Sequence, residues 1–231
     1  MNSVSVIIVA AGEGRRFGKA KQFSVLKGRT VLDWSLESFE AHEAVCRIIL
    51  VLRKGIPRDY YLKKFKKITA IADGGKTRQD SVLAGFNRLS SPDPDFDFDL
   101  NFDTEIVLVH DAARPLVSKD LISRIIETTK EKGAAVPLIP IEDTVKETTG
   151  RFGLRTVDRK KMFRAQTPQG FLYPVLEEAL KIAEKNKVQG TDESYLVEML
   201  DKPVQGIPGE RRNIKITAPE DLRIAEVLFE D

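Results

Sequence analysis

Short apolar segments rich in β-branched residues alternate along the chain with segments whose apolar residues recur every three or four positions. The first pattern, typical of buried strands, occurs in SVSVIIVA (3–10), VCRIILVL (45–52), KITAIAD (67–73), EIVLVH (105–110) and GAAVPLI (133–139). The second, typical of amphipathic helices, occurs in TVLDWSLESFEA (30–41), TRQDSVLAGFNRLS (77–90) and SKDLISRIIETTKEK (118–132). Because parallel strands need crossover connections, this alternation predicts an α/β, Rossmann-like fold with a mostly parallel sheet flanked by helices.

The pattern changes over residues 140–171. Two alternating segments, TVKETT and LRTVD, flank GRFG and predict a β-hairpin that is too polar for a central strand pair. A hairpin projecting at about 140–165 is either a solvated excursion or a dimerisation arm, and the pattern alone favours neither. Towards the C-terminus, NIKIT (213–217) is predicted to be a short strand. Thr217 and Glu220 then form a predicted capping box for the last helix.

The composition fits one folded domain over residues 1–231, because 42% of the residues are apolar and 31% are charged. Cys46 is the only cysteine and lies in an apolar segment, so we expect a buried, unpaired thiol. The segment 91–104 is rich in aspartate but lacks the Gly and Glu of a calcium-binding loop, and we interpret it as a solvated acidic loop.

The charge pattern limits the classes of partner. The net charge is only +2 and the basic residues are spread along the chain, which argues against a nucleic-acid partner. No secretory leader pattern is present and no apolar run approaches the roughly 18 residues that span a bilayer. We therefore expect a cytoplasmic protein without membrane contact.

Candidate chemistry follows the first predicted strand, in AAGEGRRFGKAKQF (10–23). Small residues let the backbone approach a phosphate and direct its N–H groups at it. These residues are Ala10, Ala11, Gly12 and Gly14. Cations suited to a polyphosphate follow at Arg15, Arg16, Lys19 and Lys21. The loop is thus a predicted triphosphate site, the alternative being a Gly-rich turn without a ligand.

Two better-known phosphate motifs do not match this loop. Phe17 stands where the dinucleotide-binding fingerprint needs its third glycine. Glu13 and Ala20 stand where a P-loop needs glycine and Ser or Thr. The sequence therefore opposes both an NAD-dependent oxidoreductase and a P-loop enzyme.

Two further clusters lie at predicted strand ends, where α/β sheets bind ligands. In DGGKTRQDSV (73–82), a glycine pair ending in Gly75 allows close backbone approach, and Arg78 and Ser81 lie in the first turn of a helix. In VHDAARP (109–115), Asp111 ends a buried strand and Arg114 lies in the turn after it. Asp111 either holds Mg²⁺ bound to phosphate oxygens or caps this turn, and its position alone fits both.

The order of the motifs is more specific than any one of them. AAGEGRR, KQF, DGGKTRQDSV, VHDAARP, EDTVK, TVDRKKMFRAQTPQGF, GTDE and NIKIT-x-PED follow one another between residues 4 and 228. In this order the chain resembles the 2-C-methyl-D-erythritol 4-phosphate cytidylyltransferase family. The resemblance implies a nucleotidyltransferase that transfers CMP from CTP to 2-C-methyl-D-erythritol 4-phosphate. It would release pyrophosphate and use Mg²⁺, in non-mevalonate isoprenoid precursor biosynthesis.

The resemblance also implies roles for residues at the matching positions. Arg16 and Lys21 would stabilise the reacting phosphate, although Lys19 competes with Lys21 because the spacer after Arg16 is short. CTP would be held by Ala10, Ala11, Gly12, Gly75 and Ser81. Gly14, Arg78 and Arg114 complete the predicted nucleotide and substrate contacts.

The acceptor side is predicted in the same way. Asp111 matches the aspartate associated with Mg²⁺, and Arg159 and Lys215 match residues that position the acceptor phosphate. In the family, Thr144 and Arg159 come from an arm that reaches the partner subunit, which favours a homodimer formed through 140–165. A ribitol-5-phosphate cytidylyltransferase and a non-catalytic nucleotide-binding module remain alternatives.

Overall fold

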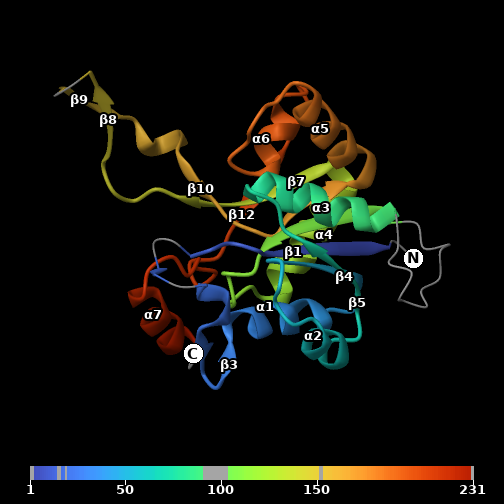
Figure 1. The fold of residues 1–231 in the computed structure, drawn as a ribbon. Helices are drawn as coiled ribbons and strands as arrows, with labels where there is room; N and C mark the ends of the chain where they lie inside the picture. The colour runs from blue at the N-terminus through green and yellow to red at the C-terminus, as the bar shows by residue number, and fades with distance from the viewer. Residues whose placement is uncertain (1–2, 15–16, 19, 91–103, 151–152, 230–231) are drawn as a thin grey trace.

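The computed structural model describes most of the chain as a sheet between two layers of helices, with one hairpin projecting from the body (Figure 1). The described residues are 3–14, 17–18, 20–90, 104–150 and 153–229. The acidic segment at 91–103, Arg16 and Lys19 lie outside these ranges, so the predictions for them are not addressed by the structure.

The central sheet is mixed but mostly parallel. Its strand order is β10-β7-β11-β6-β1-β4-β5, and β12 also pairs with β7. The strands are β1 Val4–Ala10, β4 Val45–Leu52, β5 Ile68–Asp73, β6 Ile106–Asp111, β7 Ala134–Pro140, β10 Phe163–Ala165, β11 Gln169–Leu172 and β12 Gln205–Pro208. Strands β6, β1, β4 and β5 are parallel neighbours, whereas β11 is antiparallel to both β6 and β7.

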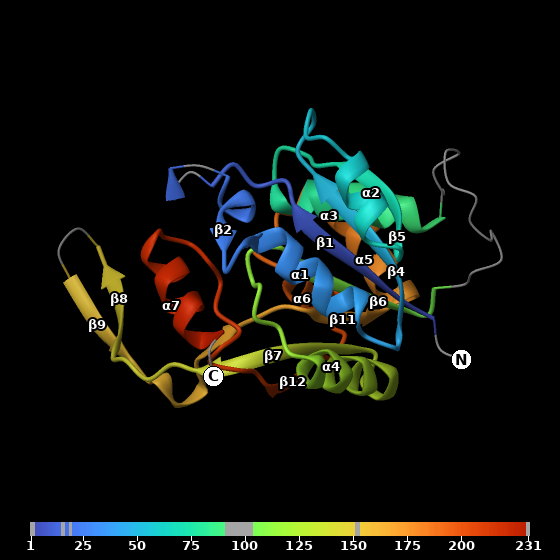
Figure 2. The same ribbon diagram turned by 90° about the horizontal axis from the view of Figure 1, so that it is seen from below.

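Helices cover both faces of the sheet (Figure 2). Their bounds are α1 Val31–Glu40, α2 Asp59–Lys64, α3 Arg78–Ser90, α4 Lys119–Lys132, α5 Tyr173–Lys185, α6 Glu193–Glu198 and α7 Glu220–Leu228. Alternate residues of β1 point to opposite faces: Val6 and Ile8 pack with α1, α2 and α4, while Ile7 packs with α3, α5 and α6. Burial on both faces explains why the strand segments are continuously apolar in the sequence.

A third apolar cluster lies beside the first loop. Here α7 packs near the short strands β2 Val25–Leu26 and β3 Arg29–Thr30, with Ala225 and Ile216 buried among their neighbours. This cluster fixes the C-terminal segment next to the loop that comes after β1.

The predicted strands and helices of the α/β core are confirmed, and so is the projecting hairpin. Strands β8 Val145–Thr149 and β9 Gly153–Val157 pair antiparallel and extend away from the body (Figure 1). The hairpin's role in a dimer stays a prediction. Within the described ranges, no helix has the length and apolar character needed to cross a membrane.

Two predictions near the C-terminus were wrong. Residues 213–217 form no strand, because side chains bond their backbone: Arg114 Nη1 donates to the carbonyl oxygen of Asn213 at 2.8 Å. The last helix has no Thr217–Glu220 capping box. Instead, Asp221 Oδ2 accepts hydrogen bonds from the N–H groups of Thr217 at 2.6 Å and Ala218 at 2.8 Å.

The thiol of Cys46 is exposed, contrary to prediction. The register of β4 against β1 shifts at this point: Val4 pairs with Val45 and Ser5 with Arg47, so Cys46 is the extra residue of a β-bulge. A bulge interrupts the alternation of strand side chains, and the apolar pattern of the sequence does not reveal it.

His110 is a fully buried polar residue at the end of β6, with its ring 4.8 Å from that of Phe39. Its Nε2 lies 3.2 Å from the carbonyl oxygen of Arg114, which can only accept, so Nε2 carries the proton. Its Nδ1 then accepts from the Thr167 hydroxyl at 3.2 Å, and that hydroxyl accepts from the Asp111 N–H at 3.1 Å. An accepting Nδ1 requires a neutral ring, and burial lowers the pKa of His110 to about 3.

This shifted pKa predicts a pH dependence of stability. The unfolded chain protonates His110 near pH 6.5, so stability present above about pH 6.5 is lost as the pH falls towards 3. The loss reaches about 1.4 kcal/mol per pH unit. We expect His110→Asn to flatten the decline in free energy of unfolding between about pH 6.5 and about pH 4.5, measured by urea denaturation. Equal slopes for the variant and the wild type would contradict a neutral, buried ring.

Candidate active site

A pocket of about 720 Å³ opens where the parallel strands end. Because β6, β1, β4 and β5 are parallel neighbours, the residues at their carboxyl ends meet at one edge of the sheet. Ala10 pairs with Leu52, and Leu52 with Asp73, while Asp111 pairs with Val9 on the other side of β1. Loops that are far apart in sequence therefore share one pocket.

The buried side chain of Gln22 shapes the first loop. Its Nε2 donates to the carbonyl oxygens of Ala10 at 2.7 Å and Gly12 at 2.9 Å. Gln22 lies in a short 3₁₀ helix, Lys21–Phe23, so its bonds also fix the position of the preceding lysine. Lys21 lines the pocket beside this loop.

The glycine pair after β5 lets a second loop approach the first. A Cβ on Gly74 would lie 2.1 Å from the Cβ of Ala11, and one on Gly75 would lie 2.2 Å from the Cβ of Asp80. The Gly75 N–H donates to Ser81 Oγ at 3.1 Å, which joins this turn to the first turn of α3. A larger residue at position 74 would push the two loops apart, and one at position 75 would displace the turn from the start of α3.

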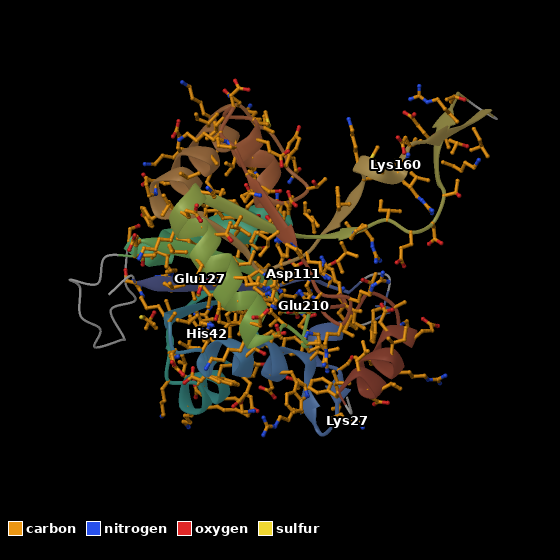
Figure 3. The ribbon with its side chains drawn as sticks, turned by 180° about the vertical axis from the view of Figure 1, so that it is seen from behind. Lys27, His42, Asp111, Glu127, Lys160 and Glu210 are labelled. Atoms are coloured by element: carbon orange, nitrogen blue, oxygen red, sulfur yellow. The ribbon has the colours of Figure 1, made fainter. Side chains whose placement is uncertain are left out.

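Asp111, which is labelled near the middle of the molecule in Figure 3, pairs with two cations that line the pocket. Arg78 Nε lies 2.9 Å from its Oδ1, and Lys215 Nζ lies 2.6 Å from its Oδ2. Burial alone would raise the pKa of Asp111. The positive charges of Arg78, Lys215 and Arg114 outweigh burial and hold this pKa well below its ordinary value, so the carboxylate is ionised.

The segment that carries Lys215 is held by side-chain hydrogen bonds. Gln166 Nε2 donates to the carbonyl oxygens of Glu210 at 2.8 Å and Asn213 at 3.1 Å, and its Oε1 accepts from the Glu210 N–H at 3.0 Å. The Ile216 N–H donates to the carbonyl oxygen of Ala113 at 2.8 Å. These bonds place Lys215 beside Asp111 although the two are 104 residues apart.

Most of the predicted site residues meet in this pocket. Those that line it are Ala10, Ala11, Gly12, Gly14, Lys21, Gly75, Arg78, Ser81, Asp111 and Lys215. Arg114 is buried and is not among the lining residues. Thr144 and Arg159 are exposed and belong to the arm, on which Lys160 lies far from Asp111 (Figure 3). Their contact with a substrate stays a prediction.

Sequence reasoning missed several residues in the pocket and behind it. Arg53 and Lys54 line the pocket just after β4, and the strand-end rule that identified the other loops would have found them. Glu193 pairs with Arg78 in the structure, with Nη1 at 2.7 Å from Oε1. The GTDE motif does not indicate that Glu193 is buried, because an acidic residue at the start of a helix is usually exposed.

The acidic groups of the pocket bear on metal binding. Among the described residues, no cluster of three or more His, Cys, Asp or Glu side chains suits a metal ion. The Asp111 carboxylate offers about four acceptor positions, of which Arg78 and Lys215 take two. Mg²⁺ is usually held by one or two carboxylates together with substrate phosphates and water. The site thus fits a Mg²⁺ ion that binds with a phosphate ligand, and not a cage made by the protein alone.

Comparison with known proteins agrees with this geometry. A family model described as IspD, 2-C-methyl-D-erythritol 4-phosphate cytidylyltransferase, matches residues 4–231. The chain is 37% identical over 229 residues to the enzyme of that name from Geobacillus kaustophilus, covering 96% of this chain and 95% of the relative. It is 38% identical over 238 residues to the one from Pelotomaculum thermopropionicum, covering 99% and 95%.

The fold gives the same result. The crystal structure of 2-C-methyl-D-erythritol 4-phosphate cytidylyltransferase from Thermus thermophilus superposes with a TM-score of 0.81 at 35% identity, covering 99% of this chain and all of that one. With pocket, motifs and full-length similarity in agreement, the chain belongs to the 2-C-methyl-D-erythritol 4-phosphate cytidylyltransferase family.

Proposed function

We propose that this chain transfers CMP from CTP to 2-C-methyl-D-erythritol 4-phosphate and releases pyrophosphate, a step of non-mevalonate isoprenoid precursor biosynthesis. The main support for the proposal is one pocket. It is lined by the two glycine-containing loops after β1 and β5 and by Lys21, Asp111 and Lys215. The pocket draws its walls from positions 9 to 217, so we propose that residues 1–231 work as one nucleotidyltransferase domain.

The chemical obstacle is electrostatic. A phosphate oxygen of the acceptor attacks the α-phosphorus of CTP, and pyrophosphate leaves from the opposite side without a covalent enzyme intermediate. A doubly charged phosphate has to approach a triphosphate, and negative charge accumulates on the non-bridging oxygens. Lys21 and Arg16 would offset this charge, and Lys215 and Arg159 would align the attacking phosphate.

Lys215 can serve the acceptor because it sits on a flexible stem and its side chain is 37% exposed. Its ammonium lies beside Asp111 before substrate binds, which keeps the charge balanced at the pocket floor. An incoming phosphate competes with the carboxylate for this ammonium group. We propose that Lys215 turns from Asp111 to the acceptor phosphate on binding.

Asp111 would hold Mg²⁺ together with oxygens of the bound phosphates. The ion, when bound, supplies positive charge to those oxygens. Asp111 is suited to this role because its carboxylate is kept ionised by Arg78 even while buried.

Nucleotide selection is assigned to the second loop. Gly75 and Ser81 lie side by side at the start of α3, where backbone groups can reach the exocyclic amine and carbonyl of cytosine. The arm at 140–165 would bring Thr144 and Arg159 to the pocket of a partner subunit. The homodimer and a cytoplasmic location stay predictions from the sequence.

The acceptor tests the proposed function most simply. With CTP and Mg²⁺ present, we expect pyrophosphate release on addition of 2-C-methyl-D-erythritol 4-phosphate, and little with ribitol 5-phosphate or with UTP in place of CTP. Faster release with ribitol 5-phosphate would favour that acceptor. Binding of CTP without release, whichever acceptor is offered, would favour a non-catalytic nucleotide-binding module.

A lysine substitution tests charge stabilisation. Lys21→Ala is expected to lower kcat roughly 10²-fold or more, by analogy with the loss of one oxyanion donor. Lys185→Ala is the control, since Lys185 is an exposed lysine at the end of α5. Steady-state pyrophosphate release measures both variants. An unchanged kcat in Lys21→Ala would remove Lys21 from the catalytic role.

Metal removal tests the assignment of Asp111. Excess EDTA should reduce turnover to background, and added Mg²⁺ should restore it, because the phosphates lose their neutralising ion. Asp111→Asn should raise the Mg²⁺ concentration needed for half the maximal rate. Full turnover in EDTA would contradict a role for Mg²⁺, and an unchanged Mg²⁺ requirement in Asp111→Asn would remove Asp111 from the metal site.

A further inference from the structure

Glu193 is a buried carboxylate behind the pocket. Its side chain is 1% exposed, and Arg78 Nη1 lies 2.7 Å from its Oε1 and 2.8 Å from its Oε2. It does not line the pocket and is 115 residues away from Arg78 in sequence. The pair therefore joins α6 to the first turn of α3 behind the charged groups of the pocket.

Burying this carboxylate costs free energy. A buried ion pair is often no more stabilising than well-packed apolar side chains of similar volume. Burial raises the pKa of Glu193, and the ion pair with Arg78 opposes this effect. Stability of the fold alone thus gives no clear reason for an acidic residue here, whereas the link through Arg78 to Asp111 does.

Arg78 connects the two carboxylates through different nitrogens. Its Nε donates to Asp111 Oδ1 and its Nη1 donates to Glu193. Because the guanidinium group is planar and rigid, two partners on different nitrogens fix its orientation. With Asp111 alone the group would be free to turn about a single contact.

Glu193 is itself held against the sheet. Asp192 Oδ1 caps α6 by accepting from the Tyr195 N–H at 3.0 Å, and Asp192 Oδ2 accepts from Gln169 Nε2 at 2.8 Å. Gln169 Oε1 accepts from the Ser194 N–H at 3.1 Å. Gln169 lies on β11, which pairs with β6, the strand that ends at Asp111. These hydrogen bonds thus connect the residues around Glu193 to β11, which pairs with β6, the strand that carries Asp111.

Helix α3 also holds the segment that leads into α6. Gln79 Nε2 donates to the carbonyl oxygen of Val188 at 3.0 Å, and Gln79 Oε1 accepts from the Gly190 N–H at 2.8 Å. The segment before α6 is therefore tied to the residue next to Arg78. Both partners of the Arg78–Glu193 pair are held on fixed elements, as positioning of a reactive group requires.

We propose that Glu193 is a positioning residue for the transfer reaction: it fixes the guanidinium of Arg78, which in turn fixes Asp111 towards the bound phosphates. The inference rests on the proposed function. It assigns Arg78 to the support of Asp111 instead of direct contact with a substrate. Glu193 touches neither substrate and acts only through Arg78.

A charge-removing variant with a matched control tests the proposal. Glu193→Gln keeps the size of the side chain but loses the ion pair, and Glu198→Gln removes the same charge from an exposed position on the same helix. For Glu193→Gln we expect kcat/KM for 2-C-methyl-D-erythritol 4-phosphate to fall roughly 10- to 100-fold, the usual effect of losing a group that orients a ligating residue. The Kd for CTP, measured by calorimetry without acceptor and without Mg²⁺, should change less than about twofold, because Asp111 reaches the phosphates through the ion.

Each result of this first test decides a different point. An unchanged kcat/KM in Glu193→Gln, or an equal fall in Glu198→Gln, would overturn the positioning role. A lower melting temperature with unchanged kinetics would assign Glu193 to stability alone. If the wild-type chain does not turn over this acceptor, the proposed function is wrong. The coupling between Arg78 and Glu193 is then tested by melting temperatures alone.

A double-mutant cycle with Arg78→Met provides that second test. If Glu193 acts through Arg78, Glu193→Gln should cause no further loss of kcat/KM in the Arg78→Met background. Arg78→Met alone leaves a buried carboxylate without its partner and should lower the melting temperature, and Glu193→Gln should restore part of it. Fully multiplicative kinetic losses, or additive shifts in melting temperature, would contradict coupling between the two residues.

Discussion

The pocket at the strand ends depends on one buried carboxylate, whose charge is stabilised by cations from distant parts of the chain. Asp111 ends a strand that is buried on both faces, where an isolated anion would be expensive. Arg78 comes from the start of α3 and Lys215 from a segment near the C-terminus. These ion pairs offset the free-energy cost of burying the Asp111 charge. They also hold three separate regions of the chain together at one point.

The sheet provides the frame on which these ion pairs form. Four parallel neighbours place their carboxyl ends along one edge, so the loop after each strand needs to be only a few residues long to reach the pocket. Gly74 removes the steric barrier between two of these loops, and the Gln22 side chain bonds backbone carbonyl groups of the loop after β1. Stability of the core and geometry of the site thus come from the same arrangement.

Elements with a short-range periodicity could be predicted from the sequence. Strands buried on both faces are continuously apolar, and the three predicted helices have clear amphipathic patterns, so these elements and the polar hairpin were found correctly. The NIKIT segment resembles a strand by alternation, but its Asn213 carbonyl oxygen accepts from the side chains of Arg114 and Gln166 instead of from a neighbouring strand. No local pattern reports such partners. The short antiparallel β11 and the exposure of Cys46 were missed for a similar reason, since both depend on neighbouring elements.

The positions of the site residues could also be predicted only in part from the sequence. Strand-end position predicted that Asp111, Lys21 and the glycine loops would lie together, and the structure places them in one pocket. The ion pairs of Asp111 with Arg78 and Lys215, and of Arg78 with Glu193, span up to 115 residues and required the tertiary structure.

The stabilisation of this charge can be measured directly as the pKa of Asp111, by ¹³C NMR of the side-chain carboxyl carbon in the folded chain without ligands. The resonance is expected to report an ionised carboxylate throughout the ordinary titration range of aspartate, with a pKa well below it. A midpoint at or above the ordinary value would show that Arg78 and Lys215 do not stabilise this charge.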